Sequence, residues 1–480
     1  MSKVNILLEV NQPHPEAFVR HAGLVASESE AVRAGETLLA NLAGFGLEVM
    51  GDVAPIPMFG PDATSYQQKG FASFGNRSTN PDVESVSTVV SCQVEQNRLA
   101  ELAGQADIQV WPNSSLTLFQ APQWAKPSFV TFEPDHLFDL ANSAGGLDCR
   151  PFREGVSMQT IRDLLGVETV WGQGFRGQNI VVGIIDEGVN GQIYPVVGGF
   201  SRPNAGRMPG SAPVTSHGSM CAADILVAAP AAKIYDYPFL GVVNSGGAIT
   251  MFQAVLNQRR MDGTPHLTNN SYGFVGRPAE EQSPNHEVWN INHPVHRKVR
   301  EVVASGAAAF FAAGNCGRQC PSGVCQSSGI GPGKSIHASN SLAEVITVAA
   351  VNSRHERIGY SSQGPGGFVR RKPDLAAYSH FFANFGPDRP GGTTEQPFDN
   401  GTSAATPVAA GVGALLLSAF PDLDPKQLKE ALLNGAFDLG SPGWDADTGF
   451  GVINAAAAYN LLVREIITKI CGRRRSRARG

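Results

Sequence analysis

The chain has few charged residues, little net charge and no long apolar run. Charged residues make up 16% of its 480 residues, against about 25% in an average globular protein. The formal net charge is −5, so no overall field draws the protein to nucleic acid. No stretch of about 18 uninterrupted apolar residues occurs, which predicts no membrane span. The hydrophobic share of 42% instead predicts a well-buried globular protein.

Cysteine is also scarce, and its use bears on the compartment. The first residues lack a basic segment followed by a long apolar run, so we expect no secretory signal and a cytoplasmic location. Free thiols are the expected state there, and seven cysteines cannot all pair within one chain. Cys316, Cys320 and Cys325 crowd one loop. Zinc would need a fourth ligand, and the sequence offers only His337 as a candidate. Because that ligand is missing from the loop itself, a disulfide or free thiols are favoured over a zinc site.

The sequence pattern divides the chain into four parts. Residues 1–140 predict a small α+β unit in the β-α-β-β-α-β order of a ferredoxin-like sandwich. Residues 141–157 are predicted to be a linker, 158–462 a second domain, and 463–480 a basic, disordered tail. The elements expected in the first part are Val4–Val10, a helix from Ser27 to Leu42, an extended Leu47–Pro57, Ser87–Val94, a helix at Glu95–Gly104, and Asp107–Trp111.

In the second part, apolar strands alternate with amphipathic helices, which predicts a parallel sheet with helices on both faces. The expected strands are Val181–Ile185, Lys233–Pro238, His266–Ser271, Ala307–Ala313 and Val345–Val351. The expected helices are His217–Val227, Ile249–Arg260, Val295–Ser305 and Thr402–Ser418. In such sheets the chemistry lies outside the carboxyl ends of the strands.

Ser403 has the most specific surroundings of any polar residue. It begins a helix of small residues, where unpaired backbone N–H groups face a partial positive charge. A nucleophile at that position gains an oxyanion donor from its own N–H. The alternative interpretation is a serine that caps a buried helix.

Three further polar residues stand at comparable positions. Asp186 ends the apolar strand Val181–Ile185, His217 begins a helix, and Asn315 follows the strand at Ala307–Ala313. Histidine can bind an acid through one ring nitrogen and a hydroxyl through the other, which is the geometry of a general base. An asparagine amide can donate to a developing oxyanion. Each alone has a structural alternative, but their joint placement on one sheet indicates a catalytic site.

These segments resemble the subtilase family of serine peptidases over about residues 160–460. The order Asp, His, Ser is that of subtilisin. The resemblance implies an Asp186–His217–Ser403 triad, an oxyanion hole of Asn315 and the Ser403 N–H, and an acyl-enzyme reaction. The matching motifs are Val181–Val189, Ser216–Cys221, Thr268–Gly273, Ala312–Asn315 and Gly401–Pro407.

The resemblance also implies how the partner, a polypeptide substrate, binds. Ser271, Tyr272 and Gly273 should pair with its backbone as an added strand, and Gly246 and Gly247 are candidates for the opposing strand. No cofactor or metal is predicted, and no ordered calcium-ligand loop can be read from the sequence. The chain departs from the family pattern at Glu187, Ser219, Met220, Ala404 and Val408, which bears on subfamily and specificity.

The first 140 residues resemble the family's inhibitory pro-domain, which implies an intramolecular inhibitor that is cut away near residues 112–157. A retained accessory domain is the alternative. Two other functions stay open. One is a catalytically silent subtilase fold that binds peptides, and the other is a dedicated protease that matures one cytoplasmic peptide or protein.

Overall fold

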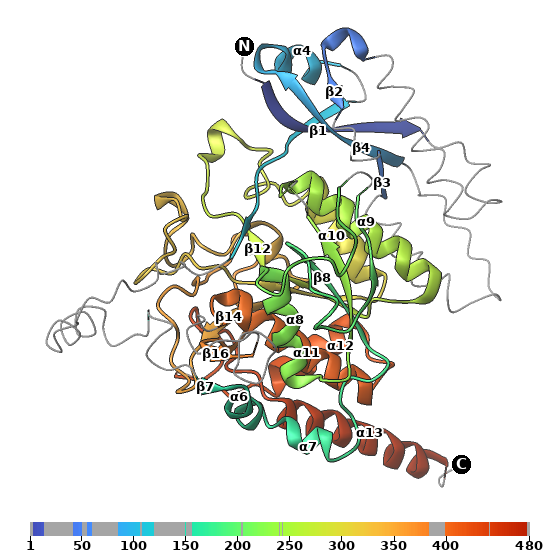
Figure 1. The fold of residues 1–480 in the computed structure, drawn as a ribbon, viewed down its shortest axis with the longest axis vertical. Helices are drawn as coiled ribbons and strands as arrows, with labels where there is room; N and C mark the ends of the chain where they lie inside the picture. Colours follow the sequence, from blue (N-terminus) through green and yellow to red (C-terminus); the bar gives the residue numbers. More distant parts are fainter. Residues whose placement is uncertain are drawn as a thin grey trace, which may run out of the picture.

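The computed structural model describes residues 3–13, 42–49, 55–59, 85–105, 108–119, 149, 156–202, 205–239, 241, 243–383, 399–440 and 442–477. A small N-terminal β-unit stands at one end of the molecule and a large α/β unit fills the rest (Figure 1). The two are joined by the segment that follows strand β5 and descends to strand β12.

The N-terminal unit is an antiparallel sheet in the order β2-β4-β1-β5, with β3 also paired to β4. Its central pair is held in register over eleven residues, from Lys3 opposite Glu95 to Pro13 opposite Ser85. The predicted extended stretch Leu47–Pro57 contains two short strands, and the helix predicted from Ser27 lies outside the described residues. The elements are β1 (Lys3–Pro13), η1 (Ala43–Phe45), β2 (Glu48–Val49), β3 (Ile56–Phe59), β4 (Ser85–Glu95), η2 (Gln96–Arg98), α4 (Leu99–Ala103) and β5 (Ile108–Pro112).

The large unit contains a seven-stranded parallel sheet in the order β15-β14-β13-β11-β8-β10-β9. This confirms the predicted α/β architecture. Its strands are β8 (Val181–Asp186), β9 (Val196–Gly199), β10 (Lys233–Pro238), β11 (Leu267–Asn270), β13 (Ala308–Ala312), β14 (Ile346–Val351) and β15 (Leu375–Tyr378). Two-stranded pairs form between β6 (Thr117–Leu118) and β12 (Tyr272–Gly273), and between β7 (Val156–Ser157) and β16 (Phe381–Phe382).

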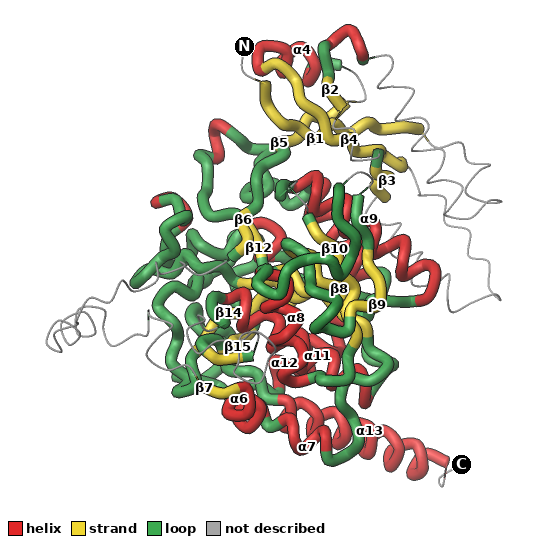
Figure 2. The backbone as a smooth tube through the Cα atoms, viewed as in Figure 1, coloured by secondary structure: helices red, strands yellow, loops and turns green. Residues whose placement is uncertain are grey.

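Helices cover both faces of this sheet (Figure 2). Helices α8 and α11 pack on one face, and α9 and α10 on the other. The helices are α6 (Met158–Leu165), α7 (Val167–Trp171), α8 (His217–Ala228), α9 (Ser245–Asp262), α10 (Pro294–Ala304), α11 (Thr402–Ala419), α12 (Pro425–Asn434) and α13 (Ala455–Arg477), with 3-10 turns η3 (Glu280–Gln282), η4 (Ser327–Gly329) and η5 (Ala338–Ser341).

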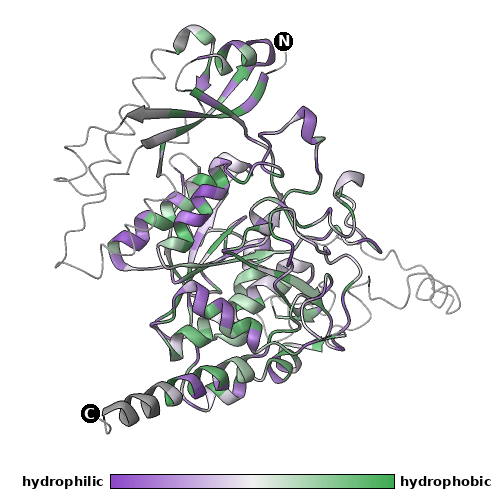
Figure 3. Ribbon diagram, turned by 180° about the vertical axis from the view of Figure 1, so that it is seen from behind, coloured by the Kyte–Doolittle hydropathy of each residue, from purple (hydrophilic) through white to green (hydrophobic). Residues whose placement is uncertain are grey.

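Side-chain periodicity explains this layering. In β8, Val182 and Ile184 belong to the core beneath α8 and α11, while Ile185 belongs to the core beneath α9 and α10. This alternation follows from the two-residue repeat of a strand. Along α10, the buried Val295, Val299 and Val302 recur at helical spacing. Hydrophobic and hydrophilic residues accordingly lie side by side along the helices of this face (Figure 3).

The N-terminal sheet shares a core with the large unit. Leu7, Met58 and Trp111 lie in one buried cluster with Phe252 of α9 and Val299 of α10. Because this apolar surface is continuous, the sheet is docked on the α9–α10 face instead of hanging from a free linker.

Two predictions about the chain are wrong. The general expectation of free thiols is wrong, because Cys149 pairs with Cys320 and Cys316 with Cys325, although the second pair is the disulfide alternative expected for the crowded loop. The basic tail is not irregular over its described residues, since α13 continues to Arg477. Within the described parts of the chain, α11 is long and apolar enough to cross a membrane, but 89% of it is buried inside the molecule, as in a core helix.

Candidate active site

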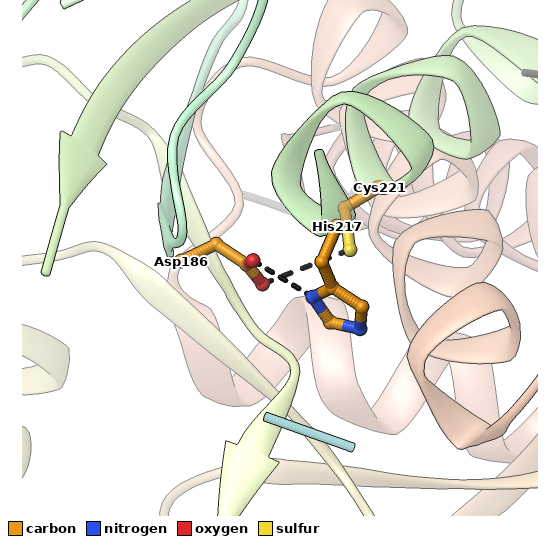
Figure 4. A group of neighbouring side chains, drawn as sticks. All are labelled: Asp186, His217 and Cys221. Atoms are coloured by element: carbon orange, nitrogen blue, oxygen red, sulfur yellow. Dashed lines mark hydrogen bonds and ion pairs between the residues drawn. The ribbon is translucent and has the colours of Figure 1, made fainter. Parts of the chain in front are cut away.

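Asp186 and His217 form a buried hydrogen-bonded pair at the carboxyl end of β8 (Figure 4). The distance between His217 Nδ1 and Asp186 Oδ1 is 2.7 Å. Ser216 caps α8 by accepting a hydrogen bond from the Ser219 N–H, which fixes the turn that presents His217. Residue 218 must be glycine, because a Cβ there would lie 2.4 Å from the Gly188 carbonyl oxygen. The close approach of α8 to the loop after β8 brings the two side chains together.

The surroundings of His217 favour its proton-accepting role. Burial alone would lower its pKa, but the charge and hydrogen bond of Asp186, together with the charge of Glu187, outweigh burial and raise it. Since Nδ1 is bonded to Asp186, the other ring nitrogen is the one left for a reaction. Nε2 is buried and has no hydrogen-bond partner among the described residues.

Ser403 lies at the first turn of α11, as predicted, and Cys221 connects it to the acid. The Cys221 Sγ is 3.6 Å from the Ser403 carbonyl oxygen and 3.8 Å from Asp186 Oδ2. Burial raises the pKa of Cys221 well above its usual value, with the Asp186 charge adding to the effect. The neutral thiol therefore acts as a packing group between α8 and α11, in agreement with its interpretation as a buried thiol.

The side-chain amide of Asn315 is held in one orientation. Its Oδ1 accepts hydrogen bonds from the Thr402 N–H at 2.9 Å and from the Thr402 hydroxyl at 3.0 Å. These two donors define which end of the amide is oxygen, so Nδ2 is free to donate. The sequence motif contains Thr402 beside Ser403, yet its positioning role was not predicted.

The Phe119 carbonyl occupies the point where these groups converge. Its oxygen lies 2.6 Å from Ser403 Oγ and 2.7 Å from Asn315 Nδ2. The Phe119 N–H donates to the Ser271 carbonyl at 3.0 Å. The chain therefore presents one of its own peptide carbonyls to the serine and to the amide, which the sequence did not indicate.

Residues 113–119 lie between two stretches of backbone, Ser271–Gly273 and Val243–Ser245, and hydrogen-bond to both as an added strand. We call the space between these two stretches the groove. Leu118 is paired with Tyr272 and Thr117 with Gly273 in the antiparallel β6–β12 ladder. These contacts agree with the predicted role of Ser271, Tyr272 and Gly273 as a backbone-pairing strand. Figures 1 and 2 show this segment running from β5 down to β12.

The opposing backbone contacts come from Val243 and Ser245, which directly precede the predicted Gly246 and Gly247. The Leu116 N–H donates to the Val243 carbonyl at 2.9 Å, and the Ser245 N–H donates to the Ser114 carbonyl at 3.1 Å. Gly246 and Gly247 lie in the first turn of α9, because Asn244 caps that helix through the Gly247 N–H. A strand interpretation of the two glycines is therefore wrong, although Gly246 still touches the segment.

The Phe119 ring fills a pocket that glycine leaves open. Phe119 is buried, and a Cβ on Gly273 would lie 2.6 Å from its Cζ atom. The same Cβ would lie 3.0 Å from Asn340 Oδ1. The large aromatic ring of Phe119 fits here only because residue 273 is a glycine.

Asp186, His217 and Cys221 also have the atoms of a metal site, within 4.8 Å of one another. The donor chemistry does not fit a metal. Asp186 is engaged by the imidazole, and a buried thiol with a strongly raised pKa would have to lose its proton to bind an ion. The hydrogen-bonded acid–base pair accounts for the cluster.

Comparison with known proteins shows which family the chain matches. Residues 177–451, more than half of the chain, match a model described as the subtilase family. Fervidolysin from Fervidobacterium pennivorans is 26% identical over 361 residues, covering 69% of this chain and 48% of the relative. Subtilisin DY from Bacillus licheniformis is 29% identical over 304 residues, covering 62% of this chain and 96% of the relative.

A solved structure supports the fold. The crystal structure of fervidolysin, titled a keratinolytic enzyme related to subtilisin, superposes with a TM-score of 0.52 at 18% identity. The match covers 96% of this chain and 61% of that one. The chain thus spans about half the length of the fervidolysin sequence that it matches.

Proposed function

Because the chain belongs to the subtilase family of serine peptidases, we propose that it is an endopeptidase that transfers an acyl group to Ser403. The observation that carries this proposal is the Phe119 carbonyl, which Ser403 Oγ and Asn315 Nδ2 both reach. The amide is placed as an oxyanion donor, and the serine hydroxyl, which donates to the carbonyl oxygen here, would turn to His217 Nε2 for attack.

Each group then has one task. Ser403 Oγ attacks the carbonyl carbon while His217 Nε2 takes the hydroxyl proton, and Asp186 stabilises the imidazolium that forms. Asn315 Nδ2 and the Ser403 N–H donate to the oxyanion. His217 returns the proton to the leaving amine, and water then hydrolyses the acyl-enzyme in the reverse sequence of proton transfers.

The first substrate of this site is the chain itself. The carbonyl in the groove belongs to the bond between Phe119 and Gln120, so we place self-cleavage there, within the range expected from the sequence. Residues 113–119 fill the groove and the preceding sheet is docked on α9 and α10. Residues 1–119 would therefore act as an intramolecular inhibitor until they leave.

Two disulfides bear on where this occurs. Disulfides persist in oxidising compartments and are rare in the cytoplasm. Cys149–Cys320 and Cys316–Cys325 therefore support an oxidising location in place of the cytoplasmic one that the sequence suggested.

Labelling with a fluorophosphonate tests the nucleophile. The processed wild-type protein should carry one adduct on Ser403, located by peptide mass spectrometry, and Ser403→Ala should carry none. Folded protein that carries no adduct even after an added protease has removed the N-terminal part would support the silent peptide-binding alternative. Cleavage of an unrelated unfolded protein such as casein would exclude the dedicated maturation protease.

A further inference from the structure

The buried carboxylate of Glu287 contacts the groove-bound segment at Ser114, five residues before Phe119. Glu287 belongs to the stretch between β12 and α10, and its side chain is fully buried. Its Oε1 accepts the Ser114 N–H at 3.0 Å, and its Oε2 accepts the Ser114 hydroxyl at 2.8 Å. One carboxylate thus binds both the backbone and the side chain of a single residue.

The neighbours of Ser114 determine which groups donate and which accept the hydrogen bonds around its hydroxyl. His286 Nδ1 accepts the Val288 N–H, so the ring proton is on Nε2, which lies 3.1 Å from the Ser114 oxygen. The hydroxyl accepts from His286 and donates to Glu287. Alanine at this position could do neither, and it would leave a buried carboxylate oxygen without a donor.

The neighbouring residue is also bound. Asn113 is buried, and its Oδ1 accepts the Gly246 N–H at 2.9 Å in the first turn of α9. The next serine differs, because Ser115 is exposed. The groove therefore distinguishes two adjacent serines, one half-buried and bound by polar partners and one facing solvent.

Glu287 is built to stay charged at this place. Burial by itself would raise its pKa, but the neighbouring imidazoles of His293 and His286 and the hydrogen bonds of Ser245 and Ser114 outweigh burial and lower it. Ser245 Oγ lies 2.5 Å from Oε1. A hydrogen bond to a charged acceptor is stronger than one between neutral groups.

We infer that Glu287, His286 and the Gly246 N–H form a binding site for an Asn-Ser pair in the substrate. The asparagine lies six residues and the serine five residues before the phenylalanine whose peptide bond is cleaved. We call these three groups the Asn–Ser site. The inference rests on the proposed function, because it counts positions from the bond presented to Ser403. It extends substrate recognition beyond the Phe119 pocket to extended polypeptides that carry this polar pair.

Peptide kinetics with the processed enzyme test the site. The substrates are residues 113–119 with a fluorogenic amide after Phe119, the same peptide with Ser114→Ala, and the same peptide with Ser115→Ala as matched control. We expect Ser114→Ala to raise KM about tenfold with little change in kcat, as the loss of a hydrogen bond to a charged group implies. Ser115→Ala should change KM less than about twofold, since its side chain faces solvent.

Enzyme variants assign the effect to Glu287. In Glu287→Gln the KM difference between the unsubstituted peptide and the Ser114→Ala peptide should fall below about threefold, because the charged acceptor is gone. Glu281→Gln, an exposed carboxylate in the same stretch, should retain the wild-type difference. A four-residue substrate of residues 116–119, which does not reach Glu287, reports whether Glu287→Gln keeps an intact active site.

The outcomes separate the two proposals. Equal KM values for all three seven-residue peptides would overturn the Asn–Ser site while leaving cleavage after Phe119 intact. Failure to cleave any peptide, including the four-residue one, would overturn the proposed function itself. If Glu287→Gln does not fold, the peptide comparison on the wild-type enzyme decides alone.

Discussion

At the scale of single residues, the proposed oxyanion hole depends on how firmly Asn315 is oriented. Replacing it with alanine removes the donor to the oxyanion, and we expect kcat to fall about 10²–10³-fold with KM little changed. Thr402→Val should cost less, because the Thr402 N–H still binds Asn315 Oδ1 after the hydroxyl is lost. Steady-state kinetics with the four-residue substrate measure both. A change in KM alone would mean that Asn315 only binds substrate.

The Asp186–His217 pair makes a prediction about pH. His217 must be neutral to accept a proton, and its pKa is raised above the usual value of about 6.5. The kcat/KM should therefore decline as the pH falls through that raised pKa. Asp186→Asn removes the charge that opposes burial, so the decline should move to lower pH while kcat drops about 10⁴-fold. An unmoved pH profile would contradict the assignment of His217 as the base.

Single residues also show where sequence reasoning ends. Asp186, His217, Ser403 and Asn315 could be proposed as catalytic because each stands at a strand end or a helix start within a motif. Glu287 could not, because it lies in an irregular stretch and its partner is 173 residues away in the chain. A contact of that separation leaves no periodic pattern in the sequence.

At the scale of elements, apolar strands were the most predictable. Strand β10 spans Lys233–Pro238 as predicted, and β8 extends the prediction by one residue. Helix α9 begins four residues early because the Asn244 side chain caps it. The pairing of cysteines was unpredictable, since spacing alone does not give connectivity.

The loop after Asn315 is the element where the disulfides act. Ser322 N–H and Cys325 Sγ both contact the Asn315 carbonyl, and Cys316–Cys325 closes this short loop. We expect Cys325→Ser to lower kcat, because the backbone of Asn315 loses its support.

Cys149→Ser provides the contrast. It opens the bond to Cys320 across 171 residues and should lower the free energy of unfolding by about 2–4 kcal/mol with kcat retained. Denaturant unfolding and kinetics of the two variants measure this. Equal kcat values in both variants would contradict a role for the Cys316–Cys325 loop in catalysis.

At the scale of the whole molecule, the N-terminal part is a docked body held by titratable groups. His293 Nε2 lies 3.0 Å from the Pro112 carbonyl oxygen, and Arg297 and Trp111 both bind the buried Glu9. Strands β1, β4 and β5 and helix α4 lie close to where the sequence predicted them, while the helix expected from Ser27 lies outside the described residues. The docking of this part on α9 and α10 could not be predicted, because apolar patterns do not say which faces meet.

Acid should release this part after cleavage. Burial lowers the pKa of both His286 and His293, outweighing the opposing charge of Glu287. Neutral histidines thus favour the docked state, so docking is strongest above the usual pKa of about 6.5 and weakens as the pH falls below it. Size-exclusion chromatography of cleaved protein should retain the N-terminal fragment at about pH 7.5 and lose it at about pH 5.

The His293→Gln variant provides a check on that behaviour, because its amide can donate to the Pro112 carbonyl without titrating. It should retain the fragment to lower pH than the wild type. Loss of the fragment at the same pH in both proteins would exclude His293 as the responsible group.

The most direct test of the whole account is the identity of the self-cleaved bond. Wild type and Ser403→Ala, produced in parallel, are compared by intact mass and N-terminal sequencing. We predict a wild-type fragment that begins at Gln120, while Ser403→Ala stays at full length. Full-length wild-type protein that is nonetheless active, or a new N-terminus elsewhere, would contradict the placement of the Phe119 carbonyl at the catalytic serine.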